Sequence, residues 1–390
     1  MEERRRAMVE AVRAGASRRA VARRFGVSLP TVQRWVARAG TGALDAVDWG
    51  DRSSAPRRQA RRASPAAEGL VRRLRIELAG SVLGEHGALA IRLALETRSD
   101  APRQLPSVRT IGRILERGGL LDGRRRVRHP PPPRGWYLPD VREHRQELDQ
   151  MDSIEELRLV GGIPLEVLTL ISLHGALPAA WPGPRLVTDR VIGSLLEHWR
   201  AHGLPGYAQF DNALVFAGTH ARPDLGRVAR TCLSLGVTPV YAPPRETGFQ
   251  AAIEAFNGRW RRACWERPDT LTMASTRDRS TAWLEAWRTA RAVRIEAAPP
   301  RSPFPADFDP EAPPVHRGRV VYLRRTDGKG FATVLTRRFE VAADWPHRLV
   351  RAEVDLDIGA IRFHALRRQQ PDDHPLLRTV PFQAPWPPLR

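Results

Sequence analysis

The chain has 390 residues, of which 63 are Lys or Arg and 43 are Asp or Glu, so its formal net charge is +20 and its pI is about 11.4. A positive field of this size favours a polyanionic partner, either nucleic acid or an anionic membrane surface. There is no run of 18 apolar residues and no signal-peptide pattern, which argues against a membrane span or secretion and favours a cytoplasmic protein. The two cysteines, Cys232 and Cys264, are expected to be reduced and are too few for a disulfide framework or a zinc site.

Three short helical patterns occupy residues 4–39. The second begins at Ser17 and ends at Gly26, and the third begins after Ser28, which can cap it, and ends before Gly40. About three residues join the second pattern to the third, which is the spacing of a helix-turn-helix. We therefore predict a DNA-binding domain over residues 1–40, although a small three-helix bundle of another kind has the same pattern. The side chains expected to face a major groove are Thr31, Gln33, Arg34 and Arg38.

A second helical region is predicted over residues 67–123, after a basic linker at 41–66. In its segment PSVRTIGRILERGGL, Ser107 can cap a helix that ends at Gly118 and Gly119. The expected inner face consists of Val108, Ile111, Ile114 and Leu115. The outward side chains Arg109, Thr110 and Arg113 resemble those of the first region, so this is either a second DNA-binding module or a helical spacer. Residues 124–140, which contain four consecutive prolines, are predicted to be a stiff basic linker.

The pattern changes again over residues 141–300, which we assign to a third domain. Three strand-like segments are followed by a helix, a strand, a helix, a strand and a helix. This order predicts a mixed five-stranded sheet with helices on its faces. Beyond it, residues 315–370 contain only short strand patterns, with GFATVLTRRFEV read as one strand, and we predict a small β-barrel followed by a proline-rich tail. The fold class is therefore multidomain α/β.

Three acidic residues fall where this sheet could bring them together. Asp152 lies in the first strand, Asp211 ends the fourth strand, and Glu254 lies in a helix beside apolar neighbours, so it is expected near the buried side. Each acid taken alone has an ordinary explanation: Asp211 as a turn residue, and the others as solvated carboxylates. Together, three buried carboxylates would repel one another unless a hard divalent cation neutralised them.

The chain resembles DDE transposases and integrases of the retroviral-integrase superfamily, in particular bacterial insertion-sequence transposases of the IS481 or IS3 type. The resemblance is carried by Gln150–Met151–Asp152 (Q-x-D), by Asp211–Asn212 with Phe216 (D-N-G-x-x-F), and by Glu254 with Asn257 (E-R-x-N). It implies an RNase H-like core, an SH3-like C-terminal barrel, and Asp152, Asp211 and Glu254 as catalytic ligands of Mg²⁺ or Mn²⁺, with two ions.

The same resemblance implies an activity, namely cleavage and strand transfer at transposon ends by transesterification. The implied partners are double-stranded DNA, as terminal inverted repeats and target, and further copies of the chain assembled on it. Basic residues around Glu254 could neutralise phosphates of the DNA end: Arg245, Arg259, Arg261 and Arg262. Two positions depart from the family pattern: Ala213 replaces a glycine, where a positive φ would be poorly tolerated, and Ala255 replaces an arginine. A catalytically inactive DNA-binding regulator with the same fold is the alternative.

Overall fold

The computed structural model describes residues 1–51, 63–121, 132–218, 225–266, 272–310, 312 and 317–383. The chain forms two compact units, Met1–Ser64 and Pro65–Arg390. No helix within these ranges combines the length and apolarity needed to cross a bilayer.

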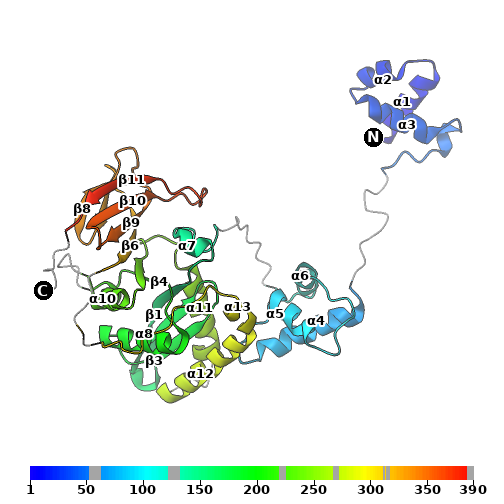
Figure 1. The fold of residues 1–390 in the computed structure, drawn as a ribbon. Helices are drawn as coiled ribbons and strands as arrows, with labels where there is room; N and C mark the ends of the chain where they lie inside the picture. The colour runs from blue at the N-terminus through cyan, green and yellow to red at the C-terminus, as the bar shows by residue number, and fades with distance from the viewer. Residues whose placement is uncertain are drawn as a thin grey trace. The chain divides into compact units, whose positions relative to one another are not determined.

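The first unit contains the predicted trihelical domain. Its helices are α1 (Glu2–Arg13), α2 (Arg18–Arg24) and α3 (Leu29–Ala39) (Figure 1). Val32 and Trp35 are buried, and Ser17 caps α2 by accepting a hydrogen bond from the backbone N of Ala20. The side chain of Ser28 makes no backbone cap; its hydroxyl instead pairs with that of Thr31.

The predicted linker at 41–66 begins later than expected. Residues 41–51, which include the short helix η1 (Leu44–Ala46), fold back on the trihelical domain. The Trp49 ring packs 6.0 Å from the Trp35 ring, and Arg5 forms an ion pair with Asp51. Apolar burial of Trp49 explains why this segment is part of the domain. Residues 52–62 of the linker lie outside the described ranges.

The second unit begins with the predicted helical module. Its helices are α4 (Pro65–Ala79), α5 (Ala88–Glu96) and α6 (Val108–Arg117). Ser107 caps α6 and Gly118 ends it, as predicted, and Ile111, Ile114 and Leu115 are buried. Val108 is 41% exposed, so its assignment to the inner face was wrong: it lies in the first turn, beyond the reach of α4 and α5.

The Pro-rich linker also ends earlier than predicted. Residues 122–131 are outside the described part, but Trp136 and Tyr137 are buried against the core, and α7 (Pro139–Arg142) follows them. Two adjacent aromatic side chains bury a large apolar area when they pack on the core. This burial makes the stretch part of the folded core, whereas a linker would be solvated.

The core has five strands in the order β3-β2-β1-β4-β5, the strand order of the RNase H-like fold. The strands β1 (Leu148–Arg158), β2 (Pro164–Ser172) and β3 (Pro178–Gly183) pair antiparallel, whereas β4 (Tyr207–Phe210) and β5 (Thr238–Tyr241) run parallel to β1. A short η2 (Val160–Gly162) joins β1 to β2. The predicted mixed five-stranded arrangement is present.

Helices cover both faces of this sheet (Figure 1). On one face lie α8 (Thr188–His202) and α10 (Arg227–Ser234), and on the other α11 (Ala251–Trp260), its π-helical continuation η3 (Arg261–Trp265), and α12 (Met273–Ala290). The short helices α9 (Leu214–Ala217) and α13 (Ala292–Glu296) complete the core. Along β2, Val167 faces the α11 side and Leu168 the α8 side, so both faces are apolar.

The C-terminal region consists of strands, as predicted, and these strands are joined to the core sheet. Strand β6 (Arg319–Arg325) pairs in parallel with β5, and β9 (Leu349–Asp355), β10 (Ala360–Ala365) and β11 (Leu376–Pro381) continue the core sheet to nine strands. The segment read as one strand is a hairpin, β7 (Phe331–Val334) and β8 (Arg337–Glu340). Among the described residues the hairpin is paired only with itself, and it packs on the sheet through Val334.

Candidate active site

Asp152 and Asp211 lie at the same level on neighbouring parallel strands. The register pairs Gln150 of β1 with Gln209 of β4, and each acid follows its glutamine by two positions. Because side chains alternate along a strand, each acid shares a sheet face with its own glutamine. Gln150 accepts a hydrogen bond from the backbone N of Ile253 in α11, so this is the face that α11 covers. The two carboxylates predicted to be close are therefore placed on one face.

Asp152 is held by a side chain that was not among the predicted site residues. Asn257 of α11 donates from Nδ2 to the Asp152 carboxylate (2.9 Å) and accepts from the hydroxyl of Thr169 (2.7 Å). The Thr169 hydroxyl also lies 3.0 Å from the backbone oxygen of Asp152, and the backbone N of Ser153 donates to the carboxylate at 2.8 Å. Asn257 could have been singled out by its position three residues after Glu254, one helical turn away on the same face.

Glu254 lies on α11 one turn before Asn257, but its side chain is exposed. Its placement near the buried side was wrong, because Ile253, Phe256 and Asn257 occupy the face that packs on the sheet. Its charge nevertheless reaches the site. Burial raises the pKa of Asp152 most, the hydrogen bond from the backbone N of Ser153 partly offsets it, and the negative charges of Asp211, Glu254 and Glu155 add smaller increases, so that the pKa is about 6.

The turn that carries Asp211 is closed by its own carboxylate. Asp211 accepts a hydrogen bond from the backbone N of Ala213 at 2.9 Å, and burial raises its pKa. Ala213 has φ −60° and ψ 145°, an extended conformation that any residue adopts. The expectation that this position needs a glycine is wrong, and Ala213 introduces no strain into the turn.

A buried polar network positions the start of α11 against the sheet. Gln150 donates to Gln209 (2.7 Å) and to the backbone oxygen of Phe249 (2.9 Å), while the Tyr137 hydroxyl donates to the same two acceptors. These side chains are at most 2% exposed. Burying such groups is tolerated only when they are hydrogen-bonded, so the network fixes α11, and with it Glu254 and Asn257, relative to β1 and β4.

The donor chemistry of the three carboxylates suits a hard divalent cation, and the raised pKa values show repulsion that such an ion would relieve. However, no three acidic, histidine or cysteine side chains in the described ranges gather closely enough to hold one ion. Mg²⁺ usually keeps several waters and uses one or two carboxylates together with substrate phosphates. Asp152 and Asp211 are carboxylates of the kind that such a site requires. Among the described residues, Glu254, the predicted third ligand, does not form a three-residue cluster with them.

The predicted DNA-contacting side chains differ in how available they are. On α3, Gln33 and Arg34 are exposed and Thr31 is half-buried. Arg38 instead binds Asp48 (2.6 Å) and the backbone oxygen of Gly50 (2.8 Å), so it holds the residues that follow α3.

The basic side chains of the second unit divide in the same way. Arg259 stacks over the Trp287 ring at 5.5 Å and lies 3.6 Å from Glu85. These contacts hold it to the protein. All six predicted arginines of this unit are exposed, Arg259 despite these contacts; the others are Arg109, Arg113, Arg245, Arg261 and Arg262, and Thr110 is half-buried.

Comparison with known proteins identifies one domain by sequence. Residues 2–47 match the family described as a homeodomain-like domain. No curated protein matches the chain.

Solved structures similar to the chain include three from retroviruses. A chain of the simian T-cell lymphotropic virus intasome in complex with PP2A regulatory subunit B56 gamma is 14% identical (72% of this chain, 92% of that chain, TM-score 0.34). The HTLV-2 integrase catalytic core domain in complex with magnesium is 12% identical (34% and 82%, TM-score 0.26), and the BIV integrase catalytic core domain is 18% identical (37% and 97%, TM-score 0.26). The strand order above, and not these distant likenesses, carries the fold assignment.

Proposed function

We propose that this chain is a DNA-acting protein of the transposase or integrase type that cuts and joins DNA strands by metal-assisted phosphoryl transfer. The observation that carries the proposal is the placement of Asp152 and Asp211 on one sheet face, with Asn257 of α11 bonded to Asp152 and Glu254 one turn away. A homeodomain-like domain and a net charge of +20 supply the affinity for DNA. The working assembly is a multimer on paired terminal repeats.

In this proposal Asp152, Asp211 and Glu254 hold Mg²⁺ or Mn²⁺, two ions in the full site. Bound there, the ions would activate a water or 3′-hydroxyl and stabilise the leaving oxygen. The chain's own residues do the rest. Asn257 and the backbone N of Ser153 orient the Asp152 carboxylate, and the Gln150–Gln209–Tyr137 network fixes the helix that carries Glu254.

The test is a strand-cleavage and strand-transfer assay with the full chain, duplex DNA carrying the inverted repeats that flank the coding region, and Mg²⁺ or Mn²⁺. Asp211→Asn and Glu254→Gln should each abolish the product, while Glu285→Gln, an exposed acid on α12, should retain it. DNA binding measured in EDTA should survive in all three variants. Product formation by both site variants at the wild-type rate would show that these acids do not carry the chemistry.

A second candidate function is a DNA-binding regulator that keeps the fold without the activity. It is favoured by the exposure of Glu254 and by the lack of a three-carboxylate cluster in the described residues. It predicts sequence-specific duplex binding and no metal-dependent product from the wild-type chain. The same assay, run with wild-type protein alone, separates the two functions.

A further inference from the structure

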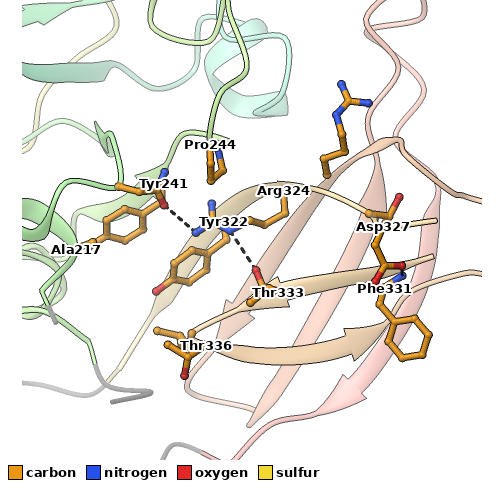
Figure 2. Close-up of a pocket in the computed structure, with 13 residues that line it drawn as sticks. Ala217, Tyr241, Pro244, Tyr322, Arg324, Asp327, Phe331, Thr333 and Thr336 are labelled. Carbon is orange, nitrogen blue, oxygen red and sulfur yellow. Dashed lines mark hydrogen bonds between the residues drawn. The ribbon is translucent and has the colours of Figure 1, made fainter. Parts of the chain in front are cut away.

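A pocket of about 670 Å³ lies next to the candidate active site. The proposed catalytic chemistry does not use this pocket. It opens between the turn after β4, the end of β5, and the strands β6 and β7 (Figure 2). Asn212, the neighbour of Asp211, lines it, together with Tyr241, Tyr322, Arg324, Thr333 and Thr336. Its volume is in the range of small-ligand sites, and its lining mixes aromatic rings with a few polar groups.

Arg324 is a partly buried cation whose hydrogen bonds all go to neutral oxygens. Its guanidinium donates to the backbone oxygens of Leu323 (2.8 Å), Thr333 (3.2 Å) and Ala242 (3.4 Å), and to the Asn212 side chain (3.0 Å). An arginine side chain has five N–H donors, so one of them is left over. No carboxylate within the described ranges forms an ion pair with Arg324, and its positive charge is therefore not compensated by the protein.

The other charges near the pocket are already paired. Arg325 forms an ion pair with Glu246, and Asp327 forms one with Arg338. Burial lowers the pKa of Arg324 to about 10, which still leaves the guanidinium charged at neutral pH. A buried charge without a counter-ion is costly in a protein interior. An anionic ligand is the group that would remove this cost.

The hairpin turn that borders the pocket is held in an unusual conformation. Leu335 and Thr336, both in the pocket wall, have φ of 47° and 64°. Turns with two positive φ values favour Asn-Gly, and residues such as leucine and threonine are disfavoured there. Strain of this kind is concentrated at ligand sites. Figure 2 shows Thr333 and Thr336 on the side of the pocket opposite Tyr241.

We propose that this pocket binds a phosphodiester group of the DNA strand that reaches the Asp211 turn, with Arg324 as its charge partner and the hydroxyl of Thr336 as a hydrogen-bond donor. The inference rests on the proposed function only in taking DNA as the ligand. Because Arg324 bonds Asn212, occupation of the pocket would place the strand directly beside the candidate catalytic turn.

The test is photocrosslinking of the full chain to duplex DNA in EDTA, so that no catalysis is needed. Cys232 and Cys264 are both buried, so Thr333→Cys supplies an exposed thiol that can be labelled with a photoactivatable reagent. Thr289→Cys, at an exposed position on α12, is the matched control. The label at position 333 should crosslink to DNA and the label at position 289 should not; equal yields at the two positions would overturn the proposal.

Two further substitutions are made in the Thr333→Cys background. Arg324→Gln removes the cation, and Thr336→Glu leaves Arg324 and its hydrogen bonds in place but adds a negative charge. Each should lower the crosslink yield about tenfold, the effect of losing one charge-assisted hydrogen bond. Retention of the yield in Thr336→Glu would overturn the proposal even if Arg324→Gln failed to fold.

The source of the phosphate, and the independence of this site from catalysis, are tested in the same system. Excess inorganic phosphate at matched ionic strength should leave most of the crosslink yield unchanged. Loss of the crosslink yield would instead indicate that the pocket binds a small free anion. Crosslinking without metal-dependent cleavage would refute the proposed catalytic function and support the pocket. Cleavage without crosslinking at position 333 would support the proposed catalytic function and refute the proposed role of the pocket.

Discussion

Asp152→Asn is expected to stabilise the metal-free protein while it removes activity. The pKa of Asp152 is raised from 3.8 to about 6, mainly by burial. A difference of about 2 in pKa corresponds to about 3 kcal/mol. Asparagine cannot keep both contacts, because Ser153 N and Asn257 Nδ2 donate to different carboxylate oxygens and the NH₂ group that replaces one of these oxygens cannot accept; one hydrogen bond of about 1 kcal/mol is lost. The expected net gain at pH 7 is about 2 kcal/mol.

The sign of the pH dependence follows from the raised pKa. Below about pH 4 Asp152 is protonated in the folded and unfolded states and destabilises neither. As pH rises through about 6 the folded wild type loses stability, and the asparagine variant does not.

The assay is differential scanning calorimetry in EDTA, with Glu296→Gln, an exposed acid on α13, as the matched control. A gain of about 2 kcal/mol raises the Tm of the unit Pro65–Arg390, which contains Asp152, by about 3 °C. Addition of Mg²⁺ should stabilise the wild type and not Asp152→Asn. A variant with the Tm of the wild type at pH 7 and an unchanged pH profile would refute the argument that burial and charge repulsion strain this site.

Four other substitutions test neighbouring conclusions. Asn257→Leu should lower strand-transfer activity about tenfold to a hundredfold and shift its pH profile to higher pH, since the Asp152 carboxylate loses a donor; an unchanged profile would show that Asn257 only fills space. Arg34→Ala should weaken DNA binding and reduce its salt dependence, measured in binding assays at several salt concentrations. Arg38→Ala should instead lower the thermal stability of the first unit, measured by calorimetry, because Arg38 binds Asp48. Interchanged effects of the two variants would contradict the geometry of α3. Ser107→Ala should destabilise α6 by about 1 kcal/mol in chemical denaturation, and no change would mean that the observed cap is energetically neutral.

Local signals were enough to predict the trihelical domain, the capped helix at 108–117 and the succession of strands and helices along the core. They depend on neighbours in sequence: Ser17 and Ser107 as caps, glycines as terminators, and apolar residues at helical or alternating spacing. Local signals failed where a distant partner decides the structure. Trp49 and Trp136 lie in polar or Pro-rich stretches that look like linkers, and only their burial against Trp35 and the core shows otherwise.

For the site, the sequence alone determined which acids were candidates, and the prediction that Asp152 and Asp211 lie close together rests on their positions near the ends of neighbouring parallel strands. Only the tertiary structure decided that Asn257 holds Asp152, that Glu254 stands exposed, and that β6 joins the core sheet and brings Arg324 to Asn212. The physical reason is that hydrogen bonding, burial and charge depend on distances between residues far apart in the chain. Spacing along the sequence does not contain those distances.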